Sequence, residues 1–197
     1  KAYVLTPDEL AAEATMLENA GVQAITIMDS AGYMFPEQAA EYTRKVKSAV
    51  SIPVGFHGHS NLGMAMANAQ AAEAAGADFI DCGLIGMARS AGNITTEGAL
   101  AIFQREGKAL QYDFYALLHF IDDKLMPAME KEGYHTPIKP LDLILGYAGC
   151  HSSFVNTYKE VAKETGTDLY KLIVETSKRN QKNPTRELME EVASSIH

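Results

Sequence analysis

The sequence predicts an α/β fold with a parallel sheet over residues 1–107, followed by an all-helical domain over residues 108–197. Short apolar segments alternate with longer segments of helical periodicity in the first region, which is typical of parallel strands joined by helical crossovers. The apolar segments show little polar alternation, as expected for strands buried on both faces. Polar side chains gather where these segments end, and both a TIM barrel and an open doubly wound sheet bind ligands at that edge.

The first helix has the clearest local signal. Residues 2–5 are apolar and predict the end of a short strand. Thr6 then suits the N-cap position and Pro7 the first helical turn, while Glu9 completes a capping box. Gly21 is expected to end this helix.

The remaining elements follow in chain order. Apolar runs predict strands at 24–28, 52–56 and 79–82, and helical spacing predicts helices near 36–48, 63–75 and 95–106. The strand pattern then disappears, and we place a domain boundary near Gly107. Beyond it, helices are expected over 114–130, 141–149, 152–165, 168–179 and 185–195.

Composition excludes several classes of protein. The 197 residues are 47% hydrophobic and 21% charged, which is ordinary for a globular chain and argues against disorder. The net charge of −8 and the lack of a basic run argue against a nucleic-acid partner. No apolar run is long enough for a membrane span. Two isolated cysteines indicate a reducing, cytoplasmic setting.

His57 and His59 are the first candidates for chemistry. They lie two residues apart at the end of a predicted strand, so both imidazoles are expected on one face. The spacing fits either two ligands of one divalent cation or a pair of hydrogen-bonded histidines, and it does not decide between them. A metal site would also need a carboxylate and oxygen ligands from water or substrate.

Four other polar or reactive residues lie near the ends of the predicted strands. Asp29 could be a metal ligand, a partner of a histidine, a substrate contact or the cap of a turn. Asp81 could bond a neighbouring side chain, and Cys82 is expected to be buried and unreactive. Arg89 lies in a glycine-rich loop, where it would steady an anionic substrate or remain solvated.

Several motifs resemble the HMG-CoA lyase-like family, also called the DRE-TIM metallolyases. The most specific is GFHGHSNLG at residues 55–63, followed by GNITTE at residues 92–97. MDSAG at residues 28–32 and ID at residues 80–81 support the resemblance. GYAGCHSSF at residues 146–154 is similar to the C-terminal domain of the family's pyruvate aldolases, so the resemblance covers nearly the whole chain.

The resemblance implies the C-terminal half of a (β/α)8 TIM barrel and a metal-dependent class II aldolase. Such an enzyme cleaves a 4-hydroxy-2-oxoacid to pyruvate and an aldehyde, using Mn²⁺ or Mg²⁺ to bind the carboxylate and keto oxygens of the substrate. His57 and His59 match the family's metal-binding histidines, and Asn93 matches a position that ligates or lies near the metal in some relatives.

The resemblance also implies further site residues and partners. Asp29, Ser30 and Arg89 would line the substrate side, and His151 would reach the pocket from the helical domain. His151 stands where many relatives have tyrosine, which affects the substrate pocket. The family's aldolases commonly pass their aldehyde to an acylating aldehyde dehydrogenase docked near the helical domain, and an oligomer is expected.

One departure from the family pattern bears on activity. The family's first strand carries an arginine and a metal-binding aspartate and is followed by a catalytic histidine, and none of these is found in this chain. The missing half-barrel would hold them, so we expect the chain to be inactive alone. Two alternatives stay open: a Claisen-type acyl-CoA lyase or synthase of the same superfamily, and a non-catalytic assembly module.

Overall fold

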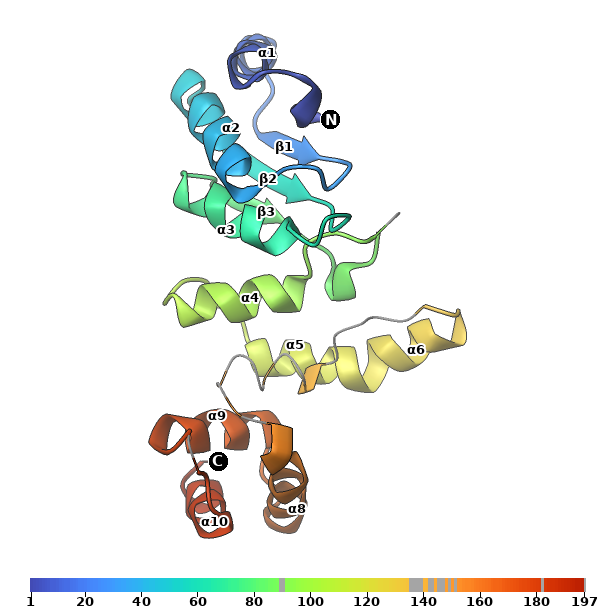
Figure 1. The fold of residues 1–197 in the computed structure, drawn as a ribbon, viewed down its shortest axis with the longest axis vertical. Coiled ribbons are helices and arrows are strands. Elements are labelled where there is room, and N and C mark those ends of the chain that lie inside the picture. The colour runs from blue at the N-terminus through green and yellow to red at the C-terminus, as the bar shows by residue number, and fades with distance from the viewer. Residues whose placement is uncertain are drawn as a thin grey trace. The chain divides into compact units, whose positions relative to one another are not determined.

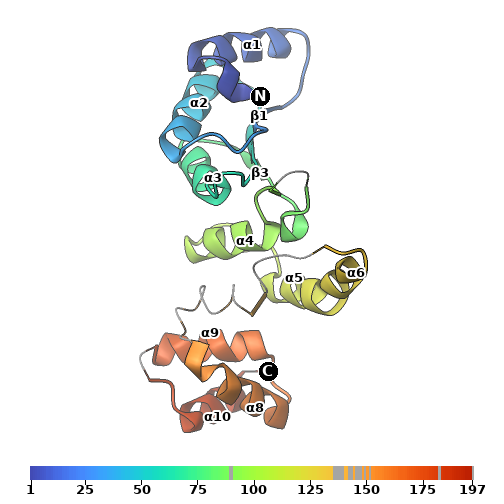
Figure 2. The same cartoon turned by 45° about the vertical axis from the view of Figure 1, so that its right-hand side comes forward.

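The chain forms two compact units, Lys1–Ala99 and Leu100–His197, in a computed structural model (Figures 1 and 2). The structure describes residues 1–88, 91–134, 140–141, 144, 148, 150, 152–181 and 183–196. The predicted domain division at residue 107 and the role assigned to the second domain stay predictions.

The first unit is built on a three-stranded parallel sheet with the order β1-β2-β3. The strands are β1 (Ile25–Asp29), β2 (Val54–Gly58) and β3 (Phe79–Asp81). The helical elements are η1 (Ala2–Val4), α1 (Pro7–Asn19), α2 (Pro36–Ala49), α3 (Ala65–Ala74), η2 (Leu84–Gly86) and α4 (Thr96–Arg105), which continues past the unit boundary. The predicted α/β fold with a parallel sheet is confirmed, and its place in a TIM barrel stays a prediction.

The N-terminal segment tests the local predictions directly. The capping box is confirmed, because Thr6 Oγ1 accepts the Glu9 N–H at 3.2 Å and Glu9 Oε2 accepts the Thr6 N–H at 2.7 Å. The strand predicted for residues 2–5 is wrong, since Ala2–Val4 forms a 3₁₀ turn with local backbone hydrogen bonds. A short apolar run does not distinguish these conformations.

The two faces of the sheet have different surroundings. Helices α2 and α3 cover one face of the sheet (Figure 1). Ile27 and Phe56, which are register partners, are both buried on this face. Side chains alternate along a strand, so Met28 and His57 point to the opposite face. Among the described residues this second face is less covered, and Met28 is 37% exposed. His57 therefore lies on the face of the sheet opposite to the one that carries Ile27 and Phe56.

The described elements of the second unit are all helical. They are α5 (Phe114–Phe120), a π-helical turn η3 (Ile121–Leu125), α6 (Met126–Lys131), η4 (Ser152–Phe154), α8 (Val155–Thr165), α9 (Leu169–Arg179) and α10 (Arg186–Ser195). The first three correspond to the helix predicted over 114–130. The π-turn comes just before Pro127, which cannot donate a helical hydrogen bond. Most of the helix predicted over 141–149 lies outside the described residues.

Apolar faces of these helices enclose one hydrophobic core. Leu118, Tyr158, Leu172, Ile173 and Met189 are fully buried there. Capping side chains fix the helix starts: Asp113 accepts the Ala116 N–H, and Asp168 accepts the Tyr170 and Lys171 N–H groups. Across the described part of the chain, no helix combines the length and apolar character needed to cross a bilayer.

Candidate metal and substrate site

His57 lies at the fourth position of β2 and is held by a carboxylate of the neighbouring strand. Its Nδ1 is 2.9 Å from Asp81 Oδ2, because the register pairs His57 directly with Asp81. The His57 side chain is 12% exposed, whereas that of Asp81 is 52% exposed. The imidazole is thus mostly enclosed, with one ring nitrogen already engaged.

His59 follows the end of β2 and lies next to His57. The two ring centroids are 5.1 Å apart and the ring planes meet at 65°. The His59 N–H donates to Asp29 O at 3.1 Å, which fixes the backbone beyond the strand against β1. The structure therefore brings the two predicted ligands together.

The loop before α4 brings Asn93 to the same place. An antiparallel bridge joins His59 and Asn93, and the Ile94 N–H donates to Gly58 O at 3.2 Å. The Ser60 N–H donates to Gly92 O at 2.9 Å. The loop thus runs along the end of β2, and two residues 34 positions apart in sequence become neighbours.

Two buried atoms in this neighbourhood lack a hydrogen-bond partner. They are Nδ1 of His59 and Oδ1 of Asn93. Leaving such atoms unsatisfied costs about 1–3 kcal/mol each, so a native site usually supplies a partner. An imidazole nitrogen and an amide oxygen can both bind a divalent cation, which means that these residues fit the implied metal.

The candidate ligands do not form a complete metal site among the described residues. Among the described residues, no group of three or more His, Cys, Asp or Glu side chains is placed to hold a metal ion. The two histidines and Asn93 would require another oxygen ligand to complete the coordination of Mn²⁺ or Mg²⁺.

Asp29 performs a structural task at the end of β1. It is fully buried, and its two carboxylate oxygens accept the N–H groups of Tyr33 at 2.9 Å and Met34 at 3.0 Å. Its register partner is Gly58, so it points to the helix-covered face, away from His57. These contacts support the turn-capping interpretation, and a direct substrate contact stays a prediction. The carboxylate partner of His57 is Asp81, a pairing that only the strand register reveals.

Gly32 belongs to the turn that Asp29 caps, and it packs tightly against the histidine segment. A Cβ at this position would lie 2.5 Å from His59 O and 2.6 Å from Asn61 N. The φ angle of Gly32 is +59°, which also favours glycine. The exposed Ser30 lies in the same turn, and its Oγ accepts a hydrogen bond from the backbone nitrogen of Lys1 at 3.2 Å.

Glu97 is a buried acid near the site that sequence reasoning did not single out. It is 6% exposed, and its Oε2 accepts the Ile85 N–H at 3.0 Å. Burial raises the pKa of its carboxyl group above the usual value. Cys82 is partly rather than fully buried, and this partial burial still raises the pKa of its thiol, as expected for an unreactive cysteine.

Two predicted residues have no described geometry. Arg89 and His151 both lie outside the described residues. Their substrate and catalytic roles stay predictions.

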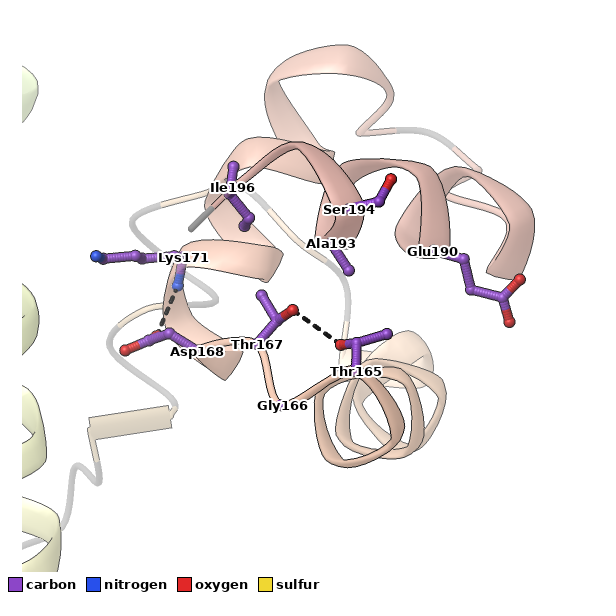
Figure 3. A pocket seen from close by; sticks show the side chains of 9 residues that line it. All are labelled: Thr165, Gly166, Thr167, Asp168, Lys171, Glu190, Ala193, Ser194 and Ile196. Atoms are coloured by element: carbon purple, nitrogen blue, oxygen red, sulfur yellow. Dashed lines mark hydrogen bonds between the residues drawn. The ribbon is translucent and has the colours of Figure 1, made fainter.

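A hollow in the second unit contains none of the predicted site residues. It lies between the end of α8, the start of α9 and α10, and Thr165, Asp168 and Lys171 contribute to its lining (Figure 3). Thr165 Oγ1 donates to Thr167 Oγ1, and Asp168 accepts the Lys171 N–H, so its polar groups already bond within the unit.

Comparison with known proteins assigns the family. A family model described as HMGL-like matches residues 2–123. The chain belongs to the HMGL-like family. The resemblance in the histidine and GNITTE motifs is therefore confirmed.

Curated relatives of this HMGL-like chain are named 4-hydroxy-2-oxovalerate aldolase. The protein from Brevibacillus brevis is 33% identical over 195 residues, covering 99% of this chain and 56% of the relative. The protein from Moorella thermoacetica is 36% identical over 194 residues, covering 97% of this chain and 56% of the relative. The chain spans about half the length of the curated relatives it matches.

Solved structures agree with the family assignment. An HMG-CoA lyase from Acinetobacter baumannii, in complex with coenzyme A and 3-methylmalate, is 26% identical and superimposes with a TM-score of 0.61. The superposition covers 75% of the HMGL-like chain and 48% of the lyase chain. The carboxyl transferase domain of Rhizobium etli pyruvate carboxylase is 17% identical with a TM-score of 0.60, over 98% of this chain and 35% of its own, which shows a shared fold alone.

Proposed function

We propose that this chain contributes the histidine half of the metal site of a class II aldolase, which cleaves a 4-hydroxy-2-oxoacid to pyruvate and an aldehyde. The observation that carries this proposal is the convergence of His57, His59 and Asn93 at the carboxyl end of β2, with two of their ligand-type atoms buried and without partners. The names of the curated relatives support the reaction class.

The cofactor proposed is Mn²⁺ or Mg²⁺. When bound, such an ion acts as a Lewis acid toward the carboxylate and keto oxygens of a 2-oxoacid. His57, His59 and Asn93 would hold it from this chain, and Asp81 keeps the His57 ring in place. At the end of β1, the backbone carbonyl of Asp29 holds the His59 segment by accepting the His59 N–H at 3.1 Å.

Other parts of the site are expected from outside these residues. A carboxylate ligand, an arginine and a general base complete the expected site, and we propose that a preceding half-barrel supplies them. Arg89 and Ser30 remain candidates for binding the carboxylate of the substrate. His151 remains the candidate catalytic residue. An acylating aldehyde dehydrogenase partner and an oligomeric assembly belong to the same proposal.

Metal binding tests the proposal first. Mn²⁺ affinity is measured by calorimetry and electron paramagnetic resonance for this chain and for the His57→Ala/His59→Ala double variant. We expect the double variant to lose at least 10-fold in affinity, because two ligands are removed. His119→Ala is the matched control, since it removes an imidazole from α5 that pairs with Asp168 instead. Equal, weak binding by wild type and double variant would contradict the proposal and favour an assembly role.

A second candidate function is a Claisen-type acyl-CoA lyase or synthase. The match to the HMG-CoA lyase bound to coenzyme A favours it. Pyruvate release is assayed with the first half-barrel of a curated relative supplied, in the presence and absence of coenzyme A thioesters. Turnover of a 4-hydroxy-2-oxoacid without coenzyme A supports the aldolase, and turnover only of thioesters supports the alternative.

A further inference from the structure

The contact between Asp81 and His57 constrains which ring nitrogen carries the proton. An ionised carboxylate only accepts hydrogen bonds, so at the 2.9 Å separation from Asp81 Oδ2 the hydrogen bond is donated by Nδ1 of His57. In the neutral ring, Nε2 then carries the lone pair that can bind a cation. A free neutral imidazole prefers the opposite tautomer, with its proton on Nε2.

Other carboxylates near the site are already committed. Both oxygens of Asp29 accept backbone N–H groups on the helix-covered face. Glu97 accepts the Ile85 N–H and is buried next to η2. Among the described residues, Asp81 is thus the carboxylate that the strand register pairs with His57.

The two histidines differ in how they are supported. His57 Nδ1 has an acceptor, whereas His59 Nδ1 is buried without a partner. The protein therefore sets the tautomer of one imidazole through a side chain and leaves the other free. A ring fixed in both tautomer and orientation needs no proton shift when it binds an ion.

We propose that Asp81 is a positioning residue that holds His57 as its Nδ1–H tautomer and directs Nε2 to a divalent cation. The part of this inference that concerns the cation rests on the proposed function. The tautomer of His57 does not depend on a bound metal. Asp81 acts only through His57 in this arrangement. It differs from a direct ligand because its Oδ2 already faces the ring nitrogen.

Nuclear magnetic resonance of ¹⁵N-histidine-labelled chain tests the inference. Long-range ¹H–¹⁵N correlations at about pH 8, where an ordinary imidazole is neutral, report the tautomer of His57 in metal-free protein. We expect the Nδ1–H form in wild type, mostly the Nε2–H form in Asp81→Ala, and partial recovery in Asp81→Glu. Asp8→Ala is the control, because Asp8 is an exposed acid of α1 that pairs with Lys45.

Mn²⁺ affinity of the same proteins completes the test. We expect Asp81→Ala to bind about 10–100-fold more weakly, as for other partners of metal-binding histidines. An unchanged tautomer in Asp81→Ala would overturn the inference, and a loss of affinity in that case would make Asp81 a direct ligand. If the tautomer changes but wild type binds no Mn²⁺, the proposed function fails while the positioning of His57 stands.

Discussion

The carboxylate of Glu97 accepts the backbone N–H of Ile85 at 3.0 Å. Ile85 has a φ angle of +49°, a left-handed conformation that is unfavourable for a β-branched residue. Glu97 lies at the start of α4, so this hydrogen bond ties the strained turn η2 to a regular helix. The turn precedes the loop that carries Asn93, and the Asn93 N–H donates to Gly86 O.

Glu97→Gln is expected to change how stability depends on pH. Burial raises the pKa of Glu97 above its usual value of about 4.5. The folded state therefore binds this proton more tightly than the unfolded state. The resulting stabilisation is fully present below about pH 4.5 and is lost as the pH rises through the raised pKa. Glutamine keeps an acceptor for Ile85 but does not ionise. Urea unfolding should therefore show the variant gaining stability relative to wild type as the pH rises above about 4.5. Glu13→Gln, on the exposed side of α1, is the control. A pH-independent difference would refute the explanation.

Asp78→Asn is expected to show the opposite sign. Two hydrogen bonds lower the pKa of Asp78: the larger effect comes from the Lys47 side chain and the smaller from the Val54 N–H. The contribution of Asp78 to the free energy of unfolding is fully present above the pKa of an ordinary aspartate. It is lost as the pH falls through the lowered pKa of the folded state. The variant should lose up to about 1 kcal/mol near neutral pH, because the pair is partly exposed. Unfolding measured down to about pH 3 should show the difference shrinking.

Gly32→Ala is expected to damage both the fold and the metal site. The new methyl group would meet His59 O at 2.5 Å, and the positive φ angle adds strain. We expect a loss of about 1–3 kcal/mol in thermal or chemical unfolding and weaker Mn²⁺ binding. Gly63→Ala is a matched control with a φ angle of +72° and no atom within 4 Å of its Cβ. Equal effects of both substitutions would show that strain alone, without the contact at His59, explains the loss.

Ile173→Ala is expected to destabilise the helical unit. Ile173 is fully buried in the core formed by α5, α8, α9 and α10. Removing its side chain to the β-carbon should cost about 2–5 kcal/mol, whereas Ile173→Val should cost about 0.5–1.5 kcal/mol. Denaturant unfolding followed by circular dichroism compares the two. Similar small losses would mean that this core repacks around the missing atoms.

Local signals predicted much of the first unit. The capping box at Thr6 fixed the start of α1 because it needs only residues three positions apart. The apolar strands were placed within two residues, since their β-branched runs are bounded by turns and helices. The strand prediction for residues 2–5 is wrong because a run of four apolar residues is too short to show either helical or strand periodicity.

Contacts between elements were less predictable from sequence. The pairing of His57 with Asp81 depends on which residues face each other across β2 and β3, and no local pattern encodes that register. The sequence allows Asp29 as a partner for a histidine, but the alternation of side chains along β1 points it to the other face. Glu97 was missed because its burial arises from packing of α4 against η2.

The register of β3 makes the chemistry of the site sensitive to errors in folding. A slip of one residue would keep a parallel ladder but turn Asp81 toward the helices and bring Ile80 or Cys82 level with His57. Such a misaligned molecule would retain nearly normal secondary structure and still lack the carboxylate that orients its imidazole. The state of the His57 ring is thus a sensitive reporter of whether a preparation has folded correctly, more so than its helix content.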